Sequence, residues 1–324
     1  MSYVTLGRWD KNDLLSMDQF SKYDIGMIQQ YAKILEPYSG IFHAPRENLD
    51  FCRGRIMKGI FRGESNTSVS TRTRESFKTA MTRLGGESDI FDEKTSSMEK
   101  GESFEDTLRY LDACADIFVI RDSVSGSLEE YASILKRPVI NAGDGINEHP
   151  TQALQDMYTM LEFLGRISNL SIVFVGDLRY GRAVHSLVKA VRKFPNKIYG
   201  VSPPELGMPE ELRGGDYRDI NLSDLADIRP DVLYAARIQK NLMPQEERER
   251  HSYRLEPKIL EMLPKHSIVM HPLPRTDEFP DELLRDERVK IFEQAYFGIP
   301  VRMALLATML GYDEKVVSLQ DRRY

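Results

Sequence analysis

Residues 70–74, Ser-Thr-Arg-Thr-Arg, place five hydrogen-bond-donating side chains in a row directly before an apolar pattern. From Phe77 to Leu84 the apolar residues recur with helical spacing, so this sequence predicts a helix that begins near Thr71. The backbone N–H groups and the dipole at a helix start favour an anion, and a guanidinium matches the geometry of phosphate. An ordinary helix cap needs only one hydroxyl. The stretch therefore indicates a phosphate-binding site.

Other polar residues follow apolar runs that read as buried strands. In parallel α/β proteins, ligands bind at the carboxyl ends of the strands, next to the starts of helices. Polar side chains in such positions are therefore candidate ligand-binding residues. They are Arg121, Asp144, His149, Asp177, Arg237, Gln239, His271 and Arg275.

The elements that must position these residues alternate along the chain. Ser21 and Asp24 have the spacing of a capping box at the start of the first helix. Helical patterns separate the later strands, which predicts parallel sheets with helices on both faces. The apolar stretch 300–310 predicts a last helix that docks on another element. The predicted strands are residues 115–122, 137–145, 171–177, 197–202, 231–239, 267–275 and 289–294.

The composition sets limits on the class of protein. A chain of 324 residues suits two domains of roughly 150 residues each. The net charge is −6 and the basic residues are dispersed, so we expect no nucleic-acid partner. The two cysteines, Cys52 and Cys114, form no C-x-x-C pair, which argues against a disulfide framework or structural zinc. With no apolar leader and no long apolar run, we expect a cytoplasmic protein that does not associate with a membrane.

Several separated motifs together resemble the aspartate and ornithine carbamoyltransferase family. The similarity extends from about residue 16 to 310. ARIQ and HPLPR are similar to the aspartate branch, because the ornithine branch ordinarily has a His-Cys-Leu-Pro segment. The motifs are STRTR (70–74), NAGDGINEHPTQALQDMYT (141–159), VGDLRYGRAVHSL (175–187), ARIQ (236–239), HPLPR (271–275) and GIPVRMALLA (298–307).

The resemblance implies a fold and an assembly. The fold class would be α/β, with two doubly wound parallel-sheet domains and the C-terminal helix packing back on the first domain. Residues 1–150 with 300–324 would bind carbamoyl phosphate, and residues 151–299 would bind the amino acid. A loop shared between neighbouring sites implies a homotrimer. Whether a regulatory chain also binds stays open.

The resemblance also implies roles for residues of the first domain. Arg121 would bind the phosphate and the carbonyl oxygen together, His149 would donate to that oxygen, and Gln152 would contact the carbamoyl nitrogen. Ser96 and Lys100 lie in the stretch that resembles the shared loop, so they would act in the neighbouring subunit. The phosphate would be held by Ser70, Thr71, Arg72 and Thr73.

For the second domain the resemblance implies an amino-acid site. Three side chains would hold the two carboxylates of aspartate, namely Arg182, Arg237 and Gln239. The backbone carbonyls of Leu273 and Pro274 would orient the amines.

The implied reaction transfers the carbamoyl group of carbamoyl phosphate to the amino group of L-aspartate, giving N-carbamoyl-L-aspartate and phosphate in pyrimidine biosynthesis. It needs no cofactor, metal or covalent nucleophile, because aligning two anions and stabilising the developing charge suffices. Two alternatives stay open. One is a carbamoyltransferase with a different amine acceptor, and the other is a catalytically silent relative that only binds anions or a partner.

Three features depart from the family pattern. About five residues near Ser65–Val69 look inserted, or else the strand before the phosphate motif is replaced, which displaces the family's glutamate to Glu64 or leaves Ser68 in its place. Asp122 stands where aspartate enzymes usually carry histidine, and Glu148 where an amide is common. Two extra carboxylates near an anion site are expected to weaken anion binding unless they are paired.

Overall fold

The chain divides into two compact units. The computed structural model describes residues 9–45, 47–63, 70–93, 96–239, 243 and 253–320. Unit 1 comprises the chain up to Leu154 together with Phe297 onwards, and unit 2 comprises Gln155–Tyr296. Helix α5 (Pro150–Leu164) contains the boundary after Leu154, so its first turn belongs to unit 1 and the rest to unit 2.

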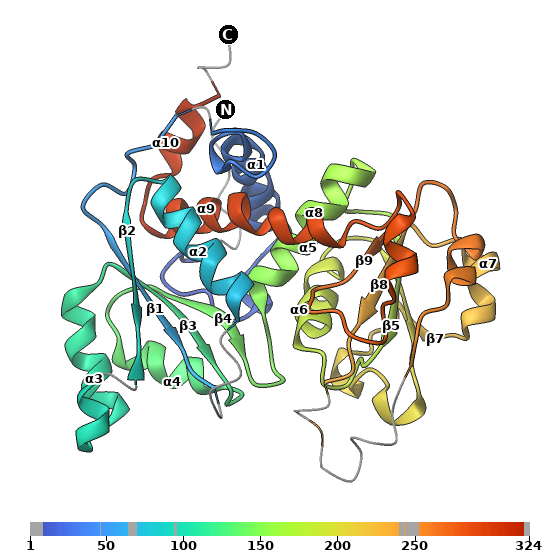
Figure 1. Cartoon of the computed structure of the whole chain (residues 1–324), viewed down its shortest axis with the longest axis horizontal. Coiled ribbons are helices and arrows are strands. Elements are labelled where there is room, and N and C mark those ends of the chain that lie inside the picture. The colour runs from blue at the N-terminus through green and yellow to red at the C-terminus, as the bar shows by residue number, and fades with distance from the viewer. Residues whose placement is uncertain are drawn as a thin grey trace. The chain divides into compact units, whose positions relative to one another are not determined.

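Unit 1 contains a sheet of four parallel strands in the order β2-β1-β3-β4 (Figure 1). The chain enters at β1, adds β2 on one side and then β3 on the other, so its direction of winding switches between β1 and β3. The predicted strands 115–122 and 137–145 are confirmed as β3 and β4, whereas β1 and β2 were not predicted. The bounds are β1 (Ile56–Phe61), β2 (Glu87–Phe91), β3 (Ile117–Asp122) and β4 (Val139–Asp144).

Helices cover both faces of this sheet. Leu108 and Leu128 of α3 and α4 pack with Ile60, Phe118 and Ile120 of the strands in one buried cluster. Helices α1, α2 and α9 lie on the opposite side (Figure 1). The helices of unit 1 are α1 (Lys22–Ser39), α2 (Thr71–Arg83), α3 (Phe104–Leu111), α4 (Ser127–Ile134), α9 (Gly298–Met309) and α10 (Asp313–Ser318), with 3₁₀ turns at Met17–Gln19, Ser97–Lys100 and Asp112–Cys114.

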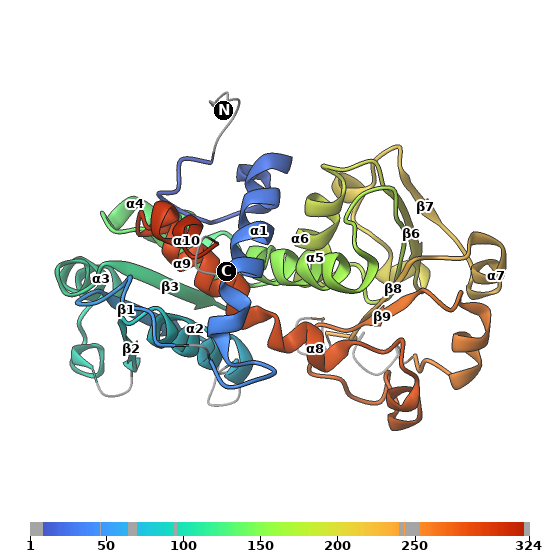
Figure 2. The same cartoon turned by 90° about the horizontal axis from the view of Figure 1, so that it is seen from above.

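Two predicted helix features are confirmed in unit 1. Helix α1 begins with the expected capping box, in which the Ser21 hydroxyl accepts from the backbone of Asp24 and the Asp24 carboxylate accepts from the backbone of Ser21. The last apolar helix, α9, packs on α1 and α2, as both views show (Figures 1 and 2). Every residue of α9 from Pro300 to Met309 is buried, so the C-terminal helix does pack back on the first unit.

Unit 2 contains a second parallel sheet, with five strands in the order β7-β6-β5-β8-β9. The chain starts at β5, winds out to β7 and returns on the other side to β8, so the winding switches between β5 and β8. Together with unit 1, this confirms a fold of two doubly wound parallel-sheet domains. The bounds are β5 (Ser171–Gly176), β6 (Lys197–Val201), β7 (Tyr217–Asp219), β8 (Val232–Ala236) and β9 (Ile268–Met270).

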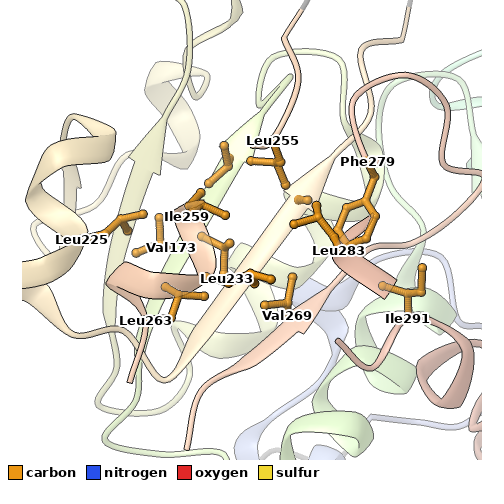
Figure 3. Close-up of a cluster of buried hydrophobic side chains, with 13 residues drawn as sticks. Val173, Leu225, Leu233, Leu255, Ile259, Leu263, Val269, Phe279, Leu283 and Ile291 are labelled. Atoms are coloured by element: carbon orange, nitrogen blue, oxygen red, sulfur yellow. The ribbon is translucent and has the colours of Figure 1, made fainter. Parts of the chain in front are cut away.

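The core of unit 2 follows from the alternation of side chains along its strands. Val173, Leu233 and Val269 point to one face, where Ile259 and Leu283 cover them (Figure 3). The intervening residues form the other face, on which the ring centroids of Phe174 and Tyr234 lie 5.5 Å apart. The remaining helices are α6 (Arg182–Val191), α7 (Leu225–Ile228) and α8 (Ile291–Tyr296), with 3₁₀ turns at Pro204–Leu206, Glu210–Leu212, Leu222–Asp224, Pro257–Met262 and Asp281–Arg285.

The prediction of a strand at residues 289–294 is wrong. Only Val289 forms a bridge, to Val269 of β9, and the chain becomes helix α8 at Ile291. The buried residues of α8 are Ile291 and Gln294, which have the three-residue spacing of a helix. Gln294 accepts a hydrogen bond from the backbone of His271 and donates to Asp156, so tertiary hydrogen bonds outweigh the β propensity of this apolar run.

Candidate active-site residues

The predicted phosphate-binding stretch lies at the start of α2. Ser70 is the N-cap residue, but its hydroxyl donates to the Thr73 hydroxyl at 2.9 Å and makes no capping bond to the first turn. Thr73 is buried, whereas Thr71 and Arg72 are exposed. The Ser70 side chain therefore does not cap the first turn, and a helix start of this kind favours an anion.

Arg121 lies at the point where the winding of unit 1 switches. It is the penultimate residue of β3 and is paired in register with Phe61, the last residue of β1. The half-buried guanidinium of Arg121 donates to the carbonyl oxygen of Ala142 at 3.4 Å. The carboxyl ends of strands at such a switch are the usual ligand site of this fold class.

His149 and Gln152 are brought together at the start of α5. His149 directly precedes Pro150, and its carbonyl oxygen accepts from the backbone of Gln152 at 3.0 Å. Both side chains are buried. The Thr151 hydroxyl lies 3.4 Å from His149 Nδ1, which fixes the orientation of the ring from one side.

The two carboxylates that depart from the family pattern are both paired. Asp122 contacts the Arg62 guanidinium at 3.1 Å and accepts from the Tyr131 hydroxyl at 2.6 Å. Glu148 accepts from the Ser16 hydroxyl at 2.5 Å and from the backbone of Met17 at 3.0 Å. Because Asp122 is paired with a guanidinium and Glu148 accepts two hydrogen bonds, these carboxylates are not expected to weaken anion binding.

Ser96 and Lys100 lie in a short loop after β2. The Ser96 hydroxyl accepts from the backbone of Met98 at 3.2 Å and donates to the carbonyl oxygen of Glu93 at 2.7 Å. Lys100 ends the 3₁₀ turn and is exposed. The apparent insertion at Ser65–Val69, with Glu64 and Ser68, lies outside the described residues. The strand in front of it, β1, is present.

Asp177 organises the corresponding switch in unit 2. It follows β5, it is fully buried, and it accepts from the backbones of Tyr180 and Gln239, each at 2.9 Å. Burial raises the pKa of Asp177, and the backbone hydrogen bonds only partly oppose this. Asp177 therefore ties the loop after β5 to the loop after β8.

Gly176 allows the ends of β5 and β8 to come together. Its φ is +113°, and an added Cβ would lie 2.2 Å from the carbonyl oxygen of Ala236. The hydroxyl of Tyr253 donates to that same oxygen at 2.7 Å. Glycine is therefore required where the two strands meet.

Arg237 and Gln239 form the second pair that the sequence predicted. Arg237 Nη2 donates to Gln239 Oε1 at 3.0 Å. Arg237 Nε is buried and has no hydrogen-bond partner among the described residues. Burial lowers the pKa of Arg237, opposed by the charges of Glu278 and Asp177. A buried donor without a protein partner indicates a position for a ligand oxygen.

Leu273 and Pro274 are positioned by His271. The backbone N–H of Leu273 donates to His271 Nδ1 at 2.9 Å, so the other ring nitrogen carries the hydrogen and donates to Glu278 at 3.0 Å. Burial would raise the pKa of Glu278, but hydrogen bonds from His271 and Thr276 outweigh it and lower the pKa to about 2. This network fixes the Leu273-Pro274 carbonyls.

Arg182, the remaining predicted residue, is the first residue of α6 and is half-buried. Its backbone N–H donates to the carbonyl oxygen of Tyr180 at 3.1 Å. Arg62 and Glu278 are not among the residues that the sequence predicted. The sequence does place Arg62 directly after a short apolar run, which could have indicated it as a strand-end residue. No strand was predicted there.

The comparisons decide the family. A model of the aspartate/ornithine carbamoyltransferase carbamoyl-P binding domain matches residues 12–162, and one of the Asp/Orn binding domain matches residues 168–309. An aspartate carbamoyltransferase catalytic subunit of Thermococcus gammatolerans is 41% identical over 313 residues, covering 94% of this chain and 99% of the relative. The chain belongs to the aspartate/ornithine carbamoyltransferase family.

Solved structures of this family have the same fold. A Trypanosoma cruzi aspartate transcarbamoylase in complex with carbamoyl phosphate and aspartate is 32% identical, with a TM-score of 0.82, covering 92% of this chain and 96% of that one. The catalytic subunit of M. jannaschii aspartate transcarbamoylase is 40% identical, with a TM-score of 0.80, covering 94% and 99%. The carbamoyltransferase family members thus match both units.

Proposed function

We propose that this chain transfers the carbamoyl group of carbamoyl phosphate to the amino group of L-aspartate. The observation that carries the choice of acceptor is Arg237, whose buried Nε lacks a partner among the described residues while Gln239 holds its Nη2. A carboxylate of the acceptor would complete this pair. The Trypanosoma cruzi relative, which binds both substrates, supports the same reading.

Unit 1 would bind carbamoyl phosphate. The phosphate would lie at the start of α2, held by backbone N–H groups, the hydroxyls of Ser70, Thr71 and Thr73 and the exposed guanidinium of Arg72. Arg121 would bridge the phosphate and the carbonyl oxygen. His149, oriented by Thr151, would donate to the carbonyl oxygen, and Gln152 would contact the carbamoyl nitrogen.

Unit 2 would bind L-aspartate. Arg182, Arg237 and Gln239 would hold its two carboxylates, and the carbonyls of Leu273 and Pro274 would accept from its amine. The backbone around these positions is held by Asp177, which accepts from Gln239, and by Glu278, which accepts from Thr276.

The chemistry then follows from alignment and charge. The amine nitrogen attacks the carbonyl carbon, a C–N bond forms, the C–O bond to phosphate breaks, and the proton lost by the amine passes to the departing phosphate. Negative charge that grows on the carbonyl oxygen would be stabilised by Arg121 and His149. Charge-assisted hydrogen bonds of this kind are worth roughly 1.5–3 kcal/mol each.

The same proposal includes a homotrimer with shared active sites. The exposure of Lys100 supports an action of the loop at Ser96–Lys100 on a neighbouring subunit. Both cysteines are free thiols, which supports the expected cytoplasmic location. Within the described part of the chain, no helix has the length and apolar character needed to cross a membrane.

A phosphate-release assay tests the function. Purified chain is mixed with carbamoyl phosphate and L-aspartate, with L-ornithine in place of aspartate as the control. We expect release of phosphate and formation of N-carbamoyl-L-aspartate only with aspartate. Turnover with ornithine or another amine would assign a different acceptor. Calorimetric binding of carbamoyl phosphate without turnover on any amine would identify a silent relative.

A further inference from the structure

Arg62 stands directly after β1, at the switch in the winding of unit 1. Its backbone N–H donates to the carbonyl oxygen of Arg121 at 2.8 Å, which extends the pairing of β1 with β3 by one residue. Arg62 is thus bonded through its main chain to the residue expected to bind both the phosphate and the carbonyl oxygen.

The side chain of Arg62 holds the same strand end. Its Nη1 donates to Asp122 Oδ2 at 3.1 Å and to the Tyr131 hydroxyl at 2.6 Å, and that hydroxyl donates to Asp122 at 2.6 Å. Asp122 is only 3% exposed. A buried carboxylate needs such partners, because desolvation of an unpaired charge is costly.

The same guanidinium also reaches the loop that carries Ser96 and Lys100. Arg62 Nε donates to Glu93 Oε1 at 2.5 Å, and the carbonyl oxygen of Glu93 accepts from both the backbone and the hydroxyl of Ser96. After the loop, the ring of Phe104 lies 3.9 Å from the guanidinium carbon of Arg62. One side chain therefore contacts the residues at both ends of the loop.

The electrostatics of this cluster are consistent with a charged Arg62. Burial would lower the pKa of Arg62, but Tyr131, Glu93 and Asp122 together raise it above its ordinary value. Burial and the neighbouring Asp122 raise the pKa of Tyr131 to about 12, so the phenol keeps its proton at neutral pH. The contacts are thus made by a cation, two carboxylates and a neutral hydroxyl.

We propose that Arg62 is a positioning residue for carbamoyl transfer, because it holds the loop of Ser96 and Lys100, which would act in the neighbouring subunit, against the sheet of its own subunit. This inference rests on the proposed function. Arg62 acts through its neighbours: its Nε and Nη1 are directed to Glu93, Asp122 and Tyr131.

The test uses variants that do not leave Asp122 buried and unpaired. The double variant Arg62→Met/Asp122→Asn removes both charges, and Arg62→Lys keeps one charge but cannot bond Glu93 and Asp122 through a planar fork. Arg109→Met is the matched control, since it removes an exposed arginine–glutamate pair on α3. Thermal unfolding of each variant reports whether the fold is kept.

Kinetics in two backgrounds separate positioning from a general loss of structure. We expect the double variant and Arg62→Lys to lower kcat/KM for carbamoyl phosphate by about tenfold to a hundredfold. In the Lys100→Ala background the same changes should have less than about a threefold effect, because the loop no longer supplies its charge. Equal effects in both backgrounds, or none in either, would overturn the inference.

A second measurement does not depend on activity. Hydrogen exchange of the amides in residues 96–104 should be faster in both Arg62 variants than in the wild type and in Arg109→Met. Unchanged exchange would overturn the inference even if the wild-type chain transfers carbamoyl groups. If the wild-type chain shows no transfer, the proposed function fails, while exchange still decides whether Arg62 holds the loop.

Discussion

Arg237 and Gln239, two residues apart at the end of β8, are joined by a 3.0 Å hydrogen bond from guanidinium to amide oxygen. Asp177 accepts from the backbone of Gln239 and so fixes the pair to the end of β5. One buried donor of Arg237, its Nε, has no partner among the residues described. This preformed pair therefore has a donor directed to a carboxylate of the acceptor.

Replacing Arg237 by alanine should weaken acceptor binding selectively. We expect KM for L-aspartate to rise at least about tenfold, because a charge-assisted bond is lost. KM for carbamoyl phosphate, whose proposed residues lie in unit 1, should change by less than about threefold. Steady-state kinetics with each substrate varied in turn measures both. Arg254→Ala removes an exposed arginine of the same unit and is the control; equal increases in both KM values would contradict the assignment.

Arg72→Ala should keep the fold and lose most of the reaction. Arg72 is exposed on the first turn of α2, so its removal leaves no cavity. Loss of one charge-assisted phosphate contact should lower kcat/KM by about tenfold to a hundredfold or more. Phosphate-release kinetics and circular dichroism measure the two effects. Lys78→Ala, on the exposed side of the same helix, should behave like the wild type; wild-type turnover by Arg72→Ala would refute its role.

Glu278 should make the stability of unit 2 depend on pH in the acid range. Its pKa lies at about 2 in the folded chain against an ordinary 4.5, so folding is favoured above pH 4.5 and this contribution is lost as the pH falls towards 2. The shift corresponds to on the order of 3 kcal/mol.

Glu278→Gln tests this pH dependence. Denaturant unfolding should show the variant less stable than the wild type at pH 6, with the difference shrinking at pH 3. A difference that stays constant between these pH values would mean that the carboxylate is not responsible.

Tyr234→Phe should destabilise unit 2 without a direct effect on substrate binding. The Tyr234 hydroxyl donates to Asp156 at 2.7 Å, and both residues are fully buried. Removing it leaves Asp156 with fewer donors, at a cost of about 1–3 kcal/mol. Denaturant midpoints measure the change, and the control is Tyr199→Phe on β6, where the side chain is only partly buried. Equal midpoints for the two variants would show that the buried bond contributes nothing.

Much of the candidate site could be predicted because it is local in sequence. The donors at 70–74 lie at the start of a helix with a regular apolar face, Arg121 lies near the end of apolar strand β3, and Arg237 directly follows apolar strand β8. The partners of Asp122 and Glu148 could not be predicted in the same way. Arg62 is 60 residues from Asp122 and Ser16 is 132 residues from Glu148, so only the tertiary fold brings them together.

The errors in the predicted secondary structure have similar physical causes. Strand β2 has the sequence Glu-Ser-Asp-Ile-Phe, and none of its residues is buried, so it lacks a hydrophobic signal. Strand β7 is only three residues long. Residues 289–294 read as a strand, but Gln294 bonds to Asp156 and to the backbone of His271, and these long-range contacts favour the helix.

The packing of α9 on unit 1 also affects the order in which the chain can fold during synthesis. Its apolar residues cover α1 and α2, yet they are synthesised only after the whole of unit 2. Unit 2 is continuous, so it can complete its fold while the earlier-made unit still has a bare hydrophobic surface. The nascent amino-terminal unit must therefore stay protected from aggregation until α9 has been synthesised.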